Sequence, residues 1–382
     1  MTRLPMLPNA RPRRASAGFS IVELMTAITI GLLILAGLSS VFVNSSNANR
    51  EMKNSAEQIE NGRFATEFLT QDLRHAGYYG ELTAMPATPA AAPDPCTVPS
   101  AGAVSDTSNS QLALPVQYIA SASIPTNCAA FLTAANLQSG SDIVVVRRAD
   151  TTAVNAAGAG TITGSTIYLQ TTGDAGDVQV GVAGAITNAQ NAAAAASTLQ
   201  RRDFSVAATG SPAQFALIAA AIRRYRTHIY FVAPCSVPNG GGTLCTGSAD
   251  DQGRPVPTLK RLELGTNGAF SIVPIVEGIE AIRIEYGVDN LPSIADPGTG
   301  LIGDGLPDSY SHTPSVTDMG NTVAVRVYVL ARNTTPTNGY IDDKTYDMGT
   351  LTTTATNDAY KRHVYGAETR IANQSGRREI PR

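Results

Sequence analysis

The 382-residue chain has no tryptophan and lacks the short motifs that identify several enzyme classes. No lysine directly follows a glycine, which excludes a Walker phosphate loop, and neither HExxH nor GxSxG occurs. The four histidines are scattered, so each is interpreted as a core or surface residue: His75, His228, His312 and His363. These absences predict a protein that is not an enzyme and carries no cofactor.

One apolar run dominates the N-terminal part. Residues 21–43 read IVELMTAITIGLLILAGLSSVFV, and Glu23 is the one charged residue among them. About 20 apolar residues are enough for a helix to cross a bilayer, so we expect a membrane span here. A carboxylate at the centre of a span costs roughly 2.5–3.5 kcal/mol, and less near an end, which predicts a cationic partner for Glu23. The alternative is an ordinary signal anchor whose Glu23 reaches the interface.

The segment before this run, residues 1–18, carries charge of one sign only. It holds four arginines and no acid. Positive charge beside the first span keeps that side in the cytoplasm, so the C-terminal part is expected in the periplasm of a cell with two membranes. The formal charge of the chain is −3, and −7 without the four leader arginines, which provides no basic field for nucleic acid.

Residues 18–25, GFSIVELM, resemble the type III signal of type IV prepilins and pseudopilins. The resemblance implies that prepilin peptidase cuts between Gly18 and Phe19 and methylates the new N-terminal residue, Phe19. Glu23 then becomes the fifth mature residue, which in this family pairs with the N-terminal amine of a neighbouring subunit. That role agrees with the physical expectation, because a buried carboxylate needs a cation. The cut precedes the apolar run, so the run stays in the mature protein, unlike a secretory signal.

The helix is predicted to continue beyond the span. We expect it over about residues 20–76, with an amphipathic outer half that ends near Gly77 and Gly80. The family resemblance implies the same shape, with a leader at residues 1–18, a helix over residues 19–80 and a periplasmic β domain over residues 81–382. No proline interrupts the outer half, and these apolar residues recur there at helical spacing: Met52, Ala56, Ile59, Phe64, Phe68, Leu69 and Leu73.

Four cysteines lie in the part expected outside the cytoplasm. An even number in an oxidising compartment predicts two disulfides, and four cysteines allow three pairings. We favour Cys235–Cys245 and Cys96–Cys128, because each pair is the closest in sequence. A zinc site is disfavoured, since CxxC spacing and nearby histidines are lacking.

The rest of the chain indicates an α+β fold in which the long helix packs on an antiparallel β-sheet. Residues 81–210, rich in alanine and proline, are interpreted as a loop-rich insertion. Residues 275–289 contain alternating apolar residues, and the segments VEGIEAIRIEYGVD and YKRHVYGAETRIANQ resemble PilW-type minor pilins; the first also resembles J-type pseudopilins. Strands are predicted over residues 142–148, 166–170, 227–232, 258–264, 275–289, 322–332 and 363–372, and a short helix over residues 188–199.

Two polar clusters carry competing interpretations. Asp289, Asp304 and Asp308 resemble the parts of a calcium loop, but the insertion LPSIADPGTGLI separates them. Calcium takes six to eight oxygens from a compact loop, so ordinary Asp/Gly turns are the preferred interpretation. The arginines at positions 223, 224 and 226 are expected on a solvated or filament-contact face rather than at DNA, because no aromatic platform surrounds them.

The resemblance implies a minor pilin of the PilW family that helps prime a type IV pilus and sits at its tip. Its expected partners are other minor pilins, the major pilin, prepilin peptidase and the assembly platform of the inner membrane, with a separate ATPase supplying energy. Two alternatives remain open: a J-type pseudopilin of type II secretion, and a membrane-tethered adhesin that binds a ligand through its loop-rich middle. The sequence leaves the contact order of the partners and any ligand undefined.

Overall fold

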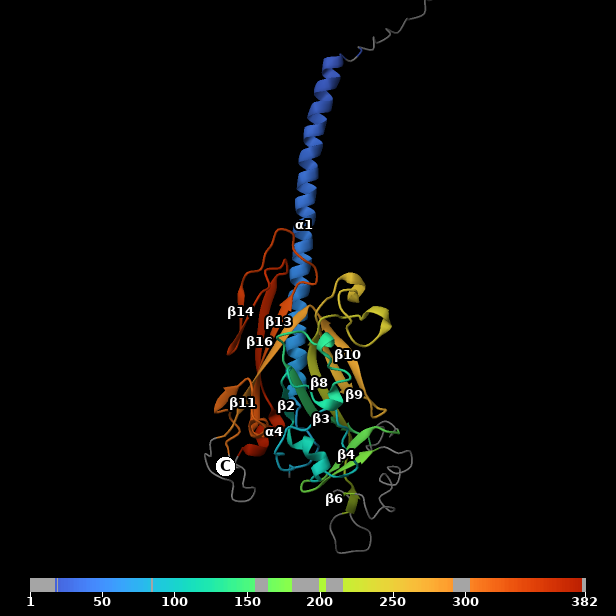
Figure 1. Ribbon diagram of the computed structural model, residues 1–382, viewed down its shortest axis with the longest axis vertical. Coiled ribbons are helices and arrows are strands. Elements are labelled where there is room, and N and C mark those ends of the chain that lie inside the picture. The colour runs from blue at the N-terminus through green and yellow to red at the C-terminus, as the bar shows by residue number, and fades with distance from the viewer. Residues whose placement is uncertain are drawn as a thin grey trace, which may run out of the picture. The chain divides into compact units, whose positions relative to one another are not determined.

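A computed structural model of the chain describes residue 18 and residues 20–83, 85–154, 164–180, 199–203, 216–290 and 303–379. It divides into two compact units, residues 1–53 and residues 54–382. Helix α1, Ile21–Arg74, begins in the first unit and ends in the second (Figure 1). Its bounds agree with the predicted helix. The predicted short helix at residues 188–199 lies almost wholly outside the described residues.

The larger sheet of the second unit has eight strands, with β8 at its centre (Figure 1). β8 pairs antiparallel with β3 on one side, and with β4 and β9 at successive positions on the other. The order is β1-β5-β4-β8-β3-β2, with β10 joined through β9. The strands are β1 (Gly102–Ala103), β2 (Val116–Ile119), β3 (Ile143–Ala153), β4 (Ile167–Thr171), β5 (Gly176–Val180), β8 (Ile222–Ala233), β9 (Thr258–Leu264) and β10 (Phe270–Glu277).

The smaller sheet has four strands in the order β12-β11-β13-β16, all antiparallel. Its strands are β11 (Ile279–Val288), β12 (Ser309–Ser311), β13 (Thr322–Arg332) and β16 (Arg362–Arg370). Gly278 separates β10 from β11 and lets the chain pass from one sheet to the other. Its φ of +73° favours glycine, and its carbonyl accepts a 2.8 Å hydrogen bond from the Arg332 backbone. The predicted strand over residues 275–289 is therefore two strands, one in each sheet.

Short elements complete the second unit. Two further strand pairs are β6 (Gln200–Asp203) with β7 (Ala216–Ala219), and β14 (Thr345–Met348) with β15 (Leu351–Thr354). Two short helices flank the smaller sheet: α3 (Val316–Gly320), which has a capping box at Ser315 and Asp318, and α4 (Ala372–Arg378). In the part of the chain that the structure describes, 3-10 helices lie at Thr107–Ala113, Thr126–Cys128, Ala134–Asn136, Asn239–Gly241 and Asp250–Gly253.

The main core joins α1 to both sheets. Ala65, Leu69 and Leu73 of α1 are fully buried in one cluster with inward side chains of the two sheets. From β11 these side chains are Ile282, Ile284 and Tyr286, which alternate as predicted, although Glu285 between them is also buried. This arrangement is the α+β architecture of a long helix on antiparallel sheet. An apolar helix stripe and apolar sheet faces cover one another, as layered domains require.

Residues 81–210 take more part in the core than a loop-rich insertion would. They contribute β2 through β5, and β3 lies next to the central β8 with Val144, Val145 and Val146 fully buried. The segment that was interpreted as a loop-rich insertion therefore also contains strands that are buried on both faces.

Candidate functional site: the N-terminal helix

The prepilin-like junction lies at the start of α1. Gly18 is exposed, and a Cβ built on it would meet no atom within 4 Å. Phe19 lies outside the described residues. Glu23 lies in the first turn, and its Oε2 accepts a 3.1 Å hydrogen bond from the backbone N–H of Ser20. The carboxylate therefore reaches back toward the helix N-terminus, where unpaired N–H groups and the helix dipole favour negative charge.

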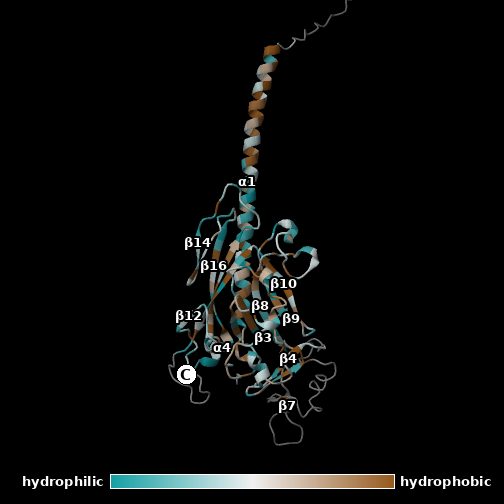
Figure 2. Cartoon of the chain, in the orientation of Figure 1, coloured by the Kyte–Doolittle hydropathy of each residue, from teal (hydrophilic) through white to brown (hydrophobic). Residues whose placement is uncertain are grey.

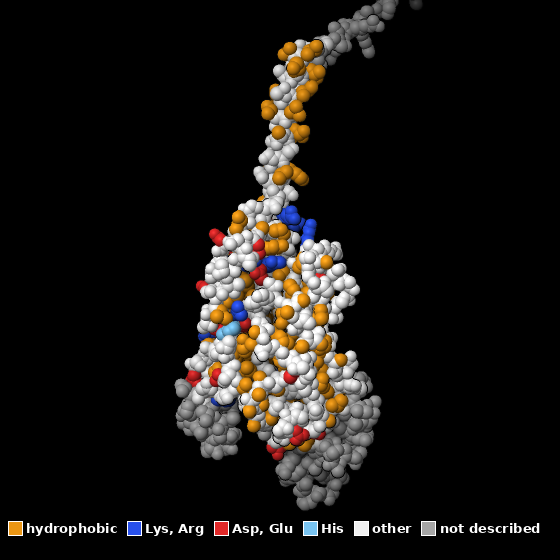
Figure 3. Space-filling view, in the orientation of Figure 1, with side chains coloured by type: hydrophobic (Ala, Val, Ile, Leu, Met, Phe, Trp, Pro, Cys, Tyr) orange, Lys and Arg blue, Asp and Glu red, His pale blue; other side chains and the backbone are white. Residues whose placement is uncertain are grey.

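All residues of the inner half of α1, residues 21–43, are exposed. Apolar residues follow this half along the face seen in Figures 2 and 3. The exposed fractions of its large apolar side chains range from 54% at Ile28 to 77% at Ile21, and α1 is the one candidate membrane span among the described residues. The hydroxyls of Thr26 and Thr29 donate to backbone carbonyls of the preceding turn, at 3.0 and 2.7 Å. A helix that is apolar all round, with its polar groups satisfied internally, suits the interior of a membrane or a bundle of apolar helices.

The outer half of α1 is fixed to the smaller sheet near its beginning. The Gln58 side-chain amide donates to the carbonyls of Ala331 and Lys361, at 3.0 and 2.8 Å. One turn further on, Gly62 lies against the ring of Tyr365, and a Cβ at position 62 would overlap that ring. Glycine at position 62 thus allows the helix to approach the sheet closely.

A buried carboxylate fixes the end of α1 to the larger sheet. Asp72 accepts hydrogen bonds from Arg148 Nε at 2.7 Å, Tyr230 Oη at 2.8 Å and His228 Nδ1 at 2.6 Å. Burial raises the pKa of Asp72, but the charges and hydrogen bonds of His228 and Arg148 outweigh it and hold that pKa well below its usual range. The residue thus stays ionised and links α1 to β3 and β8. The local helical pattern did not indicate Asp72, because its partners lie about 75 and 155 residues further along the chain.

The apolar pattern of the outer half predicted more contacts than the structure shows. Leu69 and Leu73 are buried as expected, and Phe68 packs edge-on against Tyr230 with ring centroids 6.1 Å apart. Met52, Ile59 and Phe64 are instead exposed, with 48% exposure at Ile59 and 50% at Phe64. Helical periodicity defines a stripe of apolar residues but not what covers it, so these three side chains are available to another surface.

The four cysteines form the two disulfides that the sequence favoured, Cys96–Cys128 and Cys235–Cys245. Each pair lies near a carboxylate, Asp94 or Asp250, in a cluster that resembles a metal site. Since the sulfurs are bonded to each other, they cannot act as thiolate ligands. Asp250 instead accepts from the backbone N–H groups of Asn239, Thr246 and Gly247 and thereby organises the loop that the second disulfide closes.

The weak calcium candidates are placed in separate interactions. Asp289 is buried and accepts from Arg378 Nε at 3.0 Å and from the Gly305 backbone at 2.9 Å. Asp304 and Asp308 accept from the backbone of Leu306 and Asn290, respectively. Residues 291–302, which make up most of the segment between Asp289 and Asp304, lie outside the described residues. Arg378 already supplies Asp289 with a cation, so ordinary Asp/Gly turns stay the preferred prediction and calcium the alternative.

The arginines at positions 223, 224 and 226 lie on β8, which starts earlier than predicted. They are half-buried rather than solvated. Arg226 makes a bidentate ion pair with Asp150, and Arg223 donates to backbone carbonyls of the neighbouring β3. The expectation of a solvated face is therefore wrong for these side chains, because partners on neighbouring strands occupy them, whereas a filament contact at this face stays a prediction.

Two of the four histidines contact buried carboxylates. His228 contacts Asp72, and His312 Nε2 lies 2.9 Å from Asp142. Arg283 also pairs with Asp142, at 2.8 Å, so both carboxylates have an arginine partner as well as a histidine. These networks join α1 to the larger sheet and the two sheets to each other, which is a structural role.

Comparison with known protein families yields two matches. Residues 13–39 match the prokaryotic N-terminal methylation motif, which covers the Gly18–Phe19 junction, Glu23 and most of the apolar run. Residues 245–373 match the Type IV Pilus-assembly protein W family, PilW, over a segment that holds β9 to β16. No curated protein and no solved structure matches the chain. The two family matches thus cover the start of α1 and the C-terminal third, with the larger sheet's first strands between them.

Proposed function

Because the chain is a PilW-like type IV pilin, we propose that it acts as a minor pilin that helps prime a type IV pilus and sits at its tip. In this proposal prepilin peptidase cleaves between Gly18 and Phe19 and methylates Phe19. The chain is anchored by its single apolar helix until it enters the filament, with the second unit in the periplasm. Its partners are other minor pilins, the major pilin and the inner-membrane assembly platform.

The observation that carries the proposal is the position of Glu23. It is the one charged residue between positions 20 and 49, and its carboxylate already reaches the Ser20 backbone. Cleavage after Gly18 would turn the Phe19 nitrogen, one peptide unit away from that N–H, into a charged amine. A carboxylate in an apolar segment gains most from a cation that enters the same segment, and the amine of another subunit is such a cation.

The mechanism is association rather than turnover. The exposed apolar side chains of the inner half would exchange lipid for the apolar helices of neighbouring subunits, which costs little because both surroundings are apolar. Pairing of Glu23 with a neighbour's amine then fixes the axial position of one helix against the next. The exposed Ile59 and Phe64 of the outer half extend the available contact surface beyond the membrane.

The size of the second unit supports a minor role, and the family match supports the pilus as the machine. The second unit extends over residues 54–382, which is large for a subunit repeated throughout a filament. The PilW match also favours the pilus over the alternative of type II secretion. Deletion tests this choice: loss of pili supports the proposal, whereas loss of protein secretion with normal pili supports a pseudopilin. Normal pili with lost surface attachment would indicate an adhesin.

Mass spectrometry of the mature N-terminus combined with piliation of a Glu23→Ala strain tests the mechanism. We expect a chain that starts at methylated Phe19, and loss of pili in Glu23→Ala with processing retained. Glu60→Ala, which removes an exposed acid from the outer half of the same helix, is the matched control and should leave piliation unchanged. A mature chain that starts at Met1, or normal pili without Glu23, would refute the proposal.

A second variant pair tests the peptidase step alone. Gly18→Ala should be processed more readily than Gly18→Leu, because the enzyme must accommodate a small residue before the cut. Since Gly18 is exposed and a Cβ there would meet no atom of the described residues within 4 Å, we expect neither change to disturb the fold. Equal processing of both variants would contradict cleavage at this junction.

A further inference from the structure

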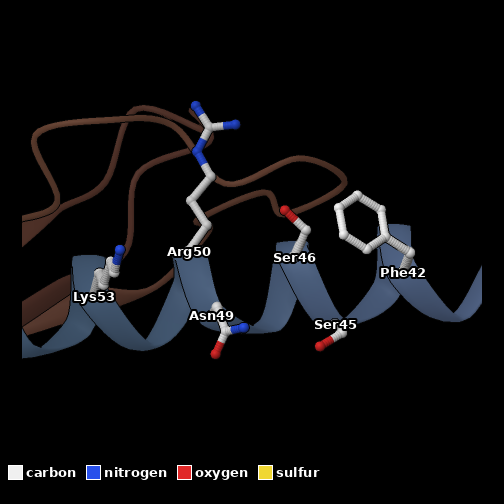
Figure 4. Close-up of a pocket in the computed structure, with 6 residues that line it drawn as sticks. All are labelled: Phe42, Ser45, Ser46, Asn49, Arg50 and Lys53. Atoms are coloured by element: carbon white, nitrogen blue, oxygen red, sulfur yellow. The ribbon is translucent and has the colours of Figure 1, made fainter.

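A surface hollow of about 420 Å³ lies on the first unit just beyond the apolar run. It is lined by Phe42, Ser45, Ser46, Asn49, Arg50 and Lys53. Figure 4 shows Phe42, Ser46 and Arg50 one turn apart on the same side of α1, with the extended Arg50 side chain above the ribbon. The hollow therefore combines an aromatic ring, hydroxyls and two cations on one short helical surface, which we call the basic face.

The basic face lies at a defined depth relative to a bilayer. The run from Ile21 to Val43 is about 34 Å long at a rise of ~1.5 Å per residue, which covers a hydrocarbon core of about 30 Å. Ser46 and Arg50 follow at about 4 and 10 Å beyond the end of the run. Because helical side chains lean toward the N-terminus, the long Arg50 side chain leans back toward the membrane. A bilayer spanned by this run would therefore have the guanidinium near the outer edge of its headgroup layer.

Both cations of the basic face are available. Arg50 and Lys53 are exposed, and among the described residues the structure gives neither an acidic partner. Glu51, the adjacent acid, is half-buried and engaged in an interaction of its own. Positive residues are also disfavoured in the segment that must cross the membrane during insertion. Arg50 and Lys53 directly after the span therefore make insertion less favourable. A binding role accounts for their presence.

We propose that the basic face binds the phosphate of an anionic phospholipid in the leaflet away from the leader. The Arg50 fork and the Lys53 ammonium supply charge-assisted donors for phosphate oxygens, Ser46 adds a hydroxyl, and Phe42 lies at the acyl boundary. An acidic surface of another protein would suit the cations equally but would not require this depth. The contact sets how far α1 extends from the membrane before assembly, and it rests only on the membrane anchoring within the proposed function.

The test uses the full-length protein in nanodiscs of equal parts phosphatidylcholine and phosphatidylglycerol. Lipids that remain bound on release are counted by native mass spectrometry. We expect the wild type to retain phosphatidylglycerol preferentially. Arg50→Gln/Lys53→Gln should lower that preference by about fivefold for each charge removed. A basic residue near an anionic surface contributes about 1 kcal/mol of binding free energy, which corresponds to about fivefold in affinity. Raising the salt concentration should reduce the wild-type preference in the same direction.

Arg254→Gln/Lys344→Gln is the matched control, because it removes one exposed arginine and one exposed lysine from the second unit. It should retain the preference. Equal retention of both lipids by the wild type, or an unchanged preference in Arg50→Gln/Lys53→Gln, would overturn the proposal, and so would a charge effect seen only on the binding of another protein. The preference should also persist in Glu23→Ala, so a failure of the filament mechanism leaves this result distinguishable.

Discussion

The two halves of α1 differ in the hydrogen-bond partners of their polar side chains and in the space around their glycines, although they belong to one helix. In the inner half, side chains are exposed all round, hydroxyls bond to the helix itself, and Gly31 and Gly37 have open space around them. In the outer half, one face is buried, Gln58 and Asp72 bond to distant strands, and Gly62 meets Tyr365. The hydrogen bonds of the inner half thus stay within the helix, whereas those of Gln58 and Asp72 in the outer half connect the helix to distant strands.

This contrast shows why a single helix serves two purposes. The buried polar contacts of the outer half make it part of the second unit and define one orientation, because each of them has a specific geometry. The inner half has no such contacts among the described residues, so lipid and neighbouring helices are interchangeable surroundings for it. Changes in the outer half should therefore alter folding, and changes in the inner half should alter membrane or filament association alone.

Asp72→Ala should produce the largest effect. It leaves the buried His228 and the half-buried Arg148 without this carboxylate, and breaking a buried ion pair in this way costs about 3–5 kcal/mol, with the ion pair from Arg148 to Asp150 holding the loss near the lower value. Urea unfolding of the full-length protein in detergent, followed by circular dichroism, measures the loss. Ile34→Ala in the inner half is the control and should leave the unfolding free energy unchanged. An equal loss in both variants would remove the distinction between the halves.

Gly62→Leu should cost about 1–3 kcal/mol, because the new side chain collides with the ring of Tyr365 and forces the helix away from the sheet. Gly37→Leu is the matched control, since a Cβ there meets no atom within 4 Å. The same unfolding measurement applies. Adding Tyr365→Ala to Gly62→Leu should recover part of the loss, and a double variant as unstable as the sum of the single changes would show that the collision is not the cause.

Acid should lower the free energy of unfolding by about 1 kcal/mol per pH unit below pH 4, because it protonates Asp72 of the outer half. The pKa of Asp72 is depressed in the folded chain, so its stabilising contribution is fully present above the unfolded carboxyl pKa near 3.9 and is lost as pH falls below it. Unfolding free energies measured at pH 5, 4 and 3 follow this loss. Asp72→Asn should flatten the profile, and a profile identical to that of the wild type would assign the acid sensitivity to other groups.

The sequence predicted those parts of the fold that are encoded locally. Helix α1 and strands β9 and β13 have the expected bounds, because each shows its own periodicity over consecutive residues. The break at Gly278 was missed, since one apolar run supplies strands to two sheets. The Asp72 cluster was also missed, because it depends on pairing between distant strands that no local pattern reveals. The N-terminal methylation motif that contains Gly18 and Glu23 was readable for the opposite reason, because it lies within one short segment of consecutive residues.

Ile59→Ser should have the smallest effect on folding and a clear effect on assembly. Ile59 is about half exposed, so the unfolding free energy should change by about 0.5 kcal/mol or less. If the exposed apolar residues of the outer half face other subunits, pilus yield should fall while processing and membrane insertion remain normal. Gln71→Ala, at an exposed polar position of the same half, is the control and should preserve yield. Unchanged yield in Ile59→Ser would limit filament contacts to the inner half, because the outer half would then have all its partners within its own chain.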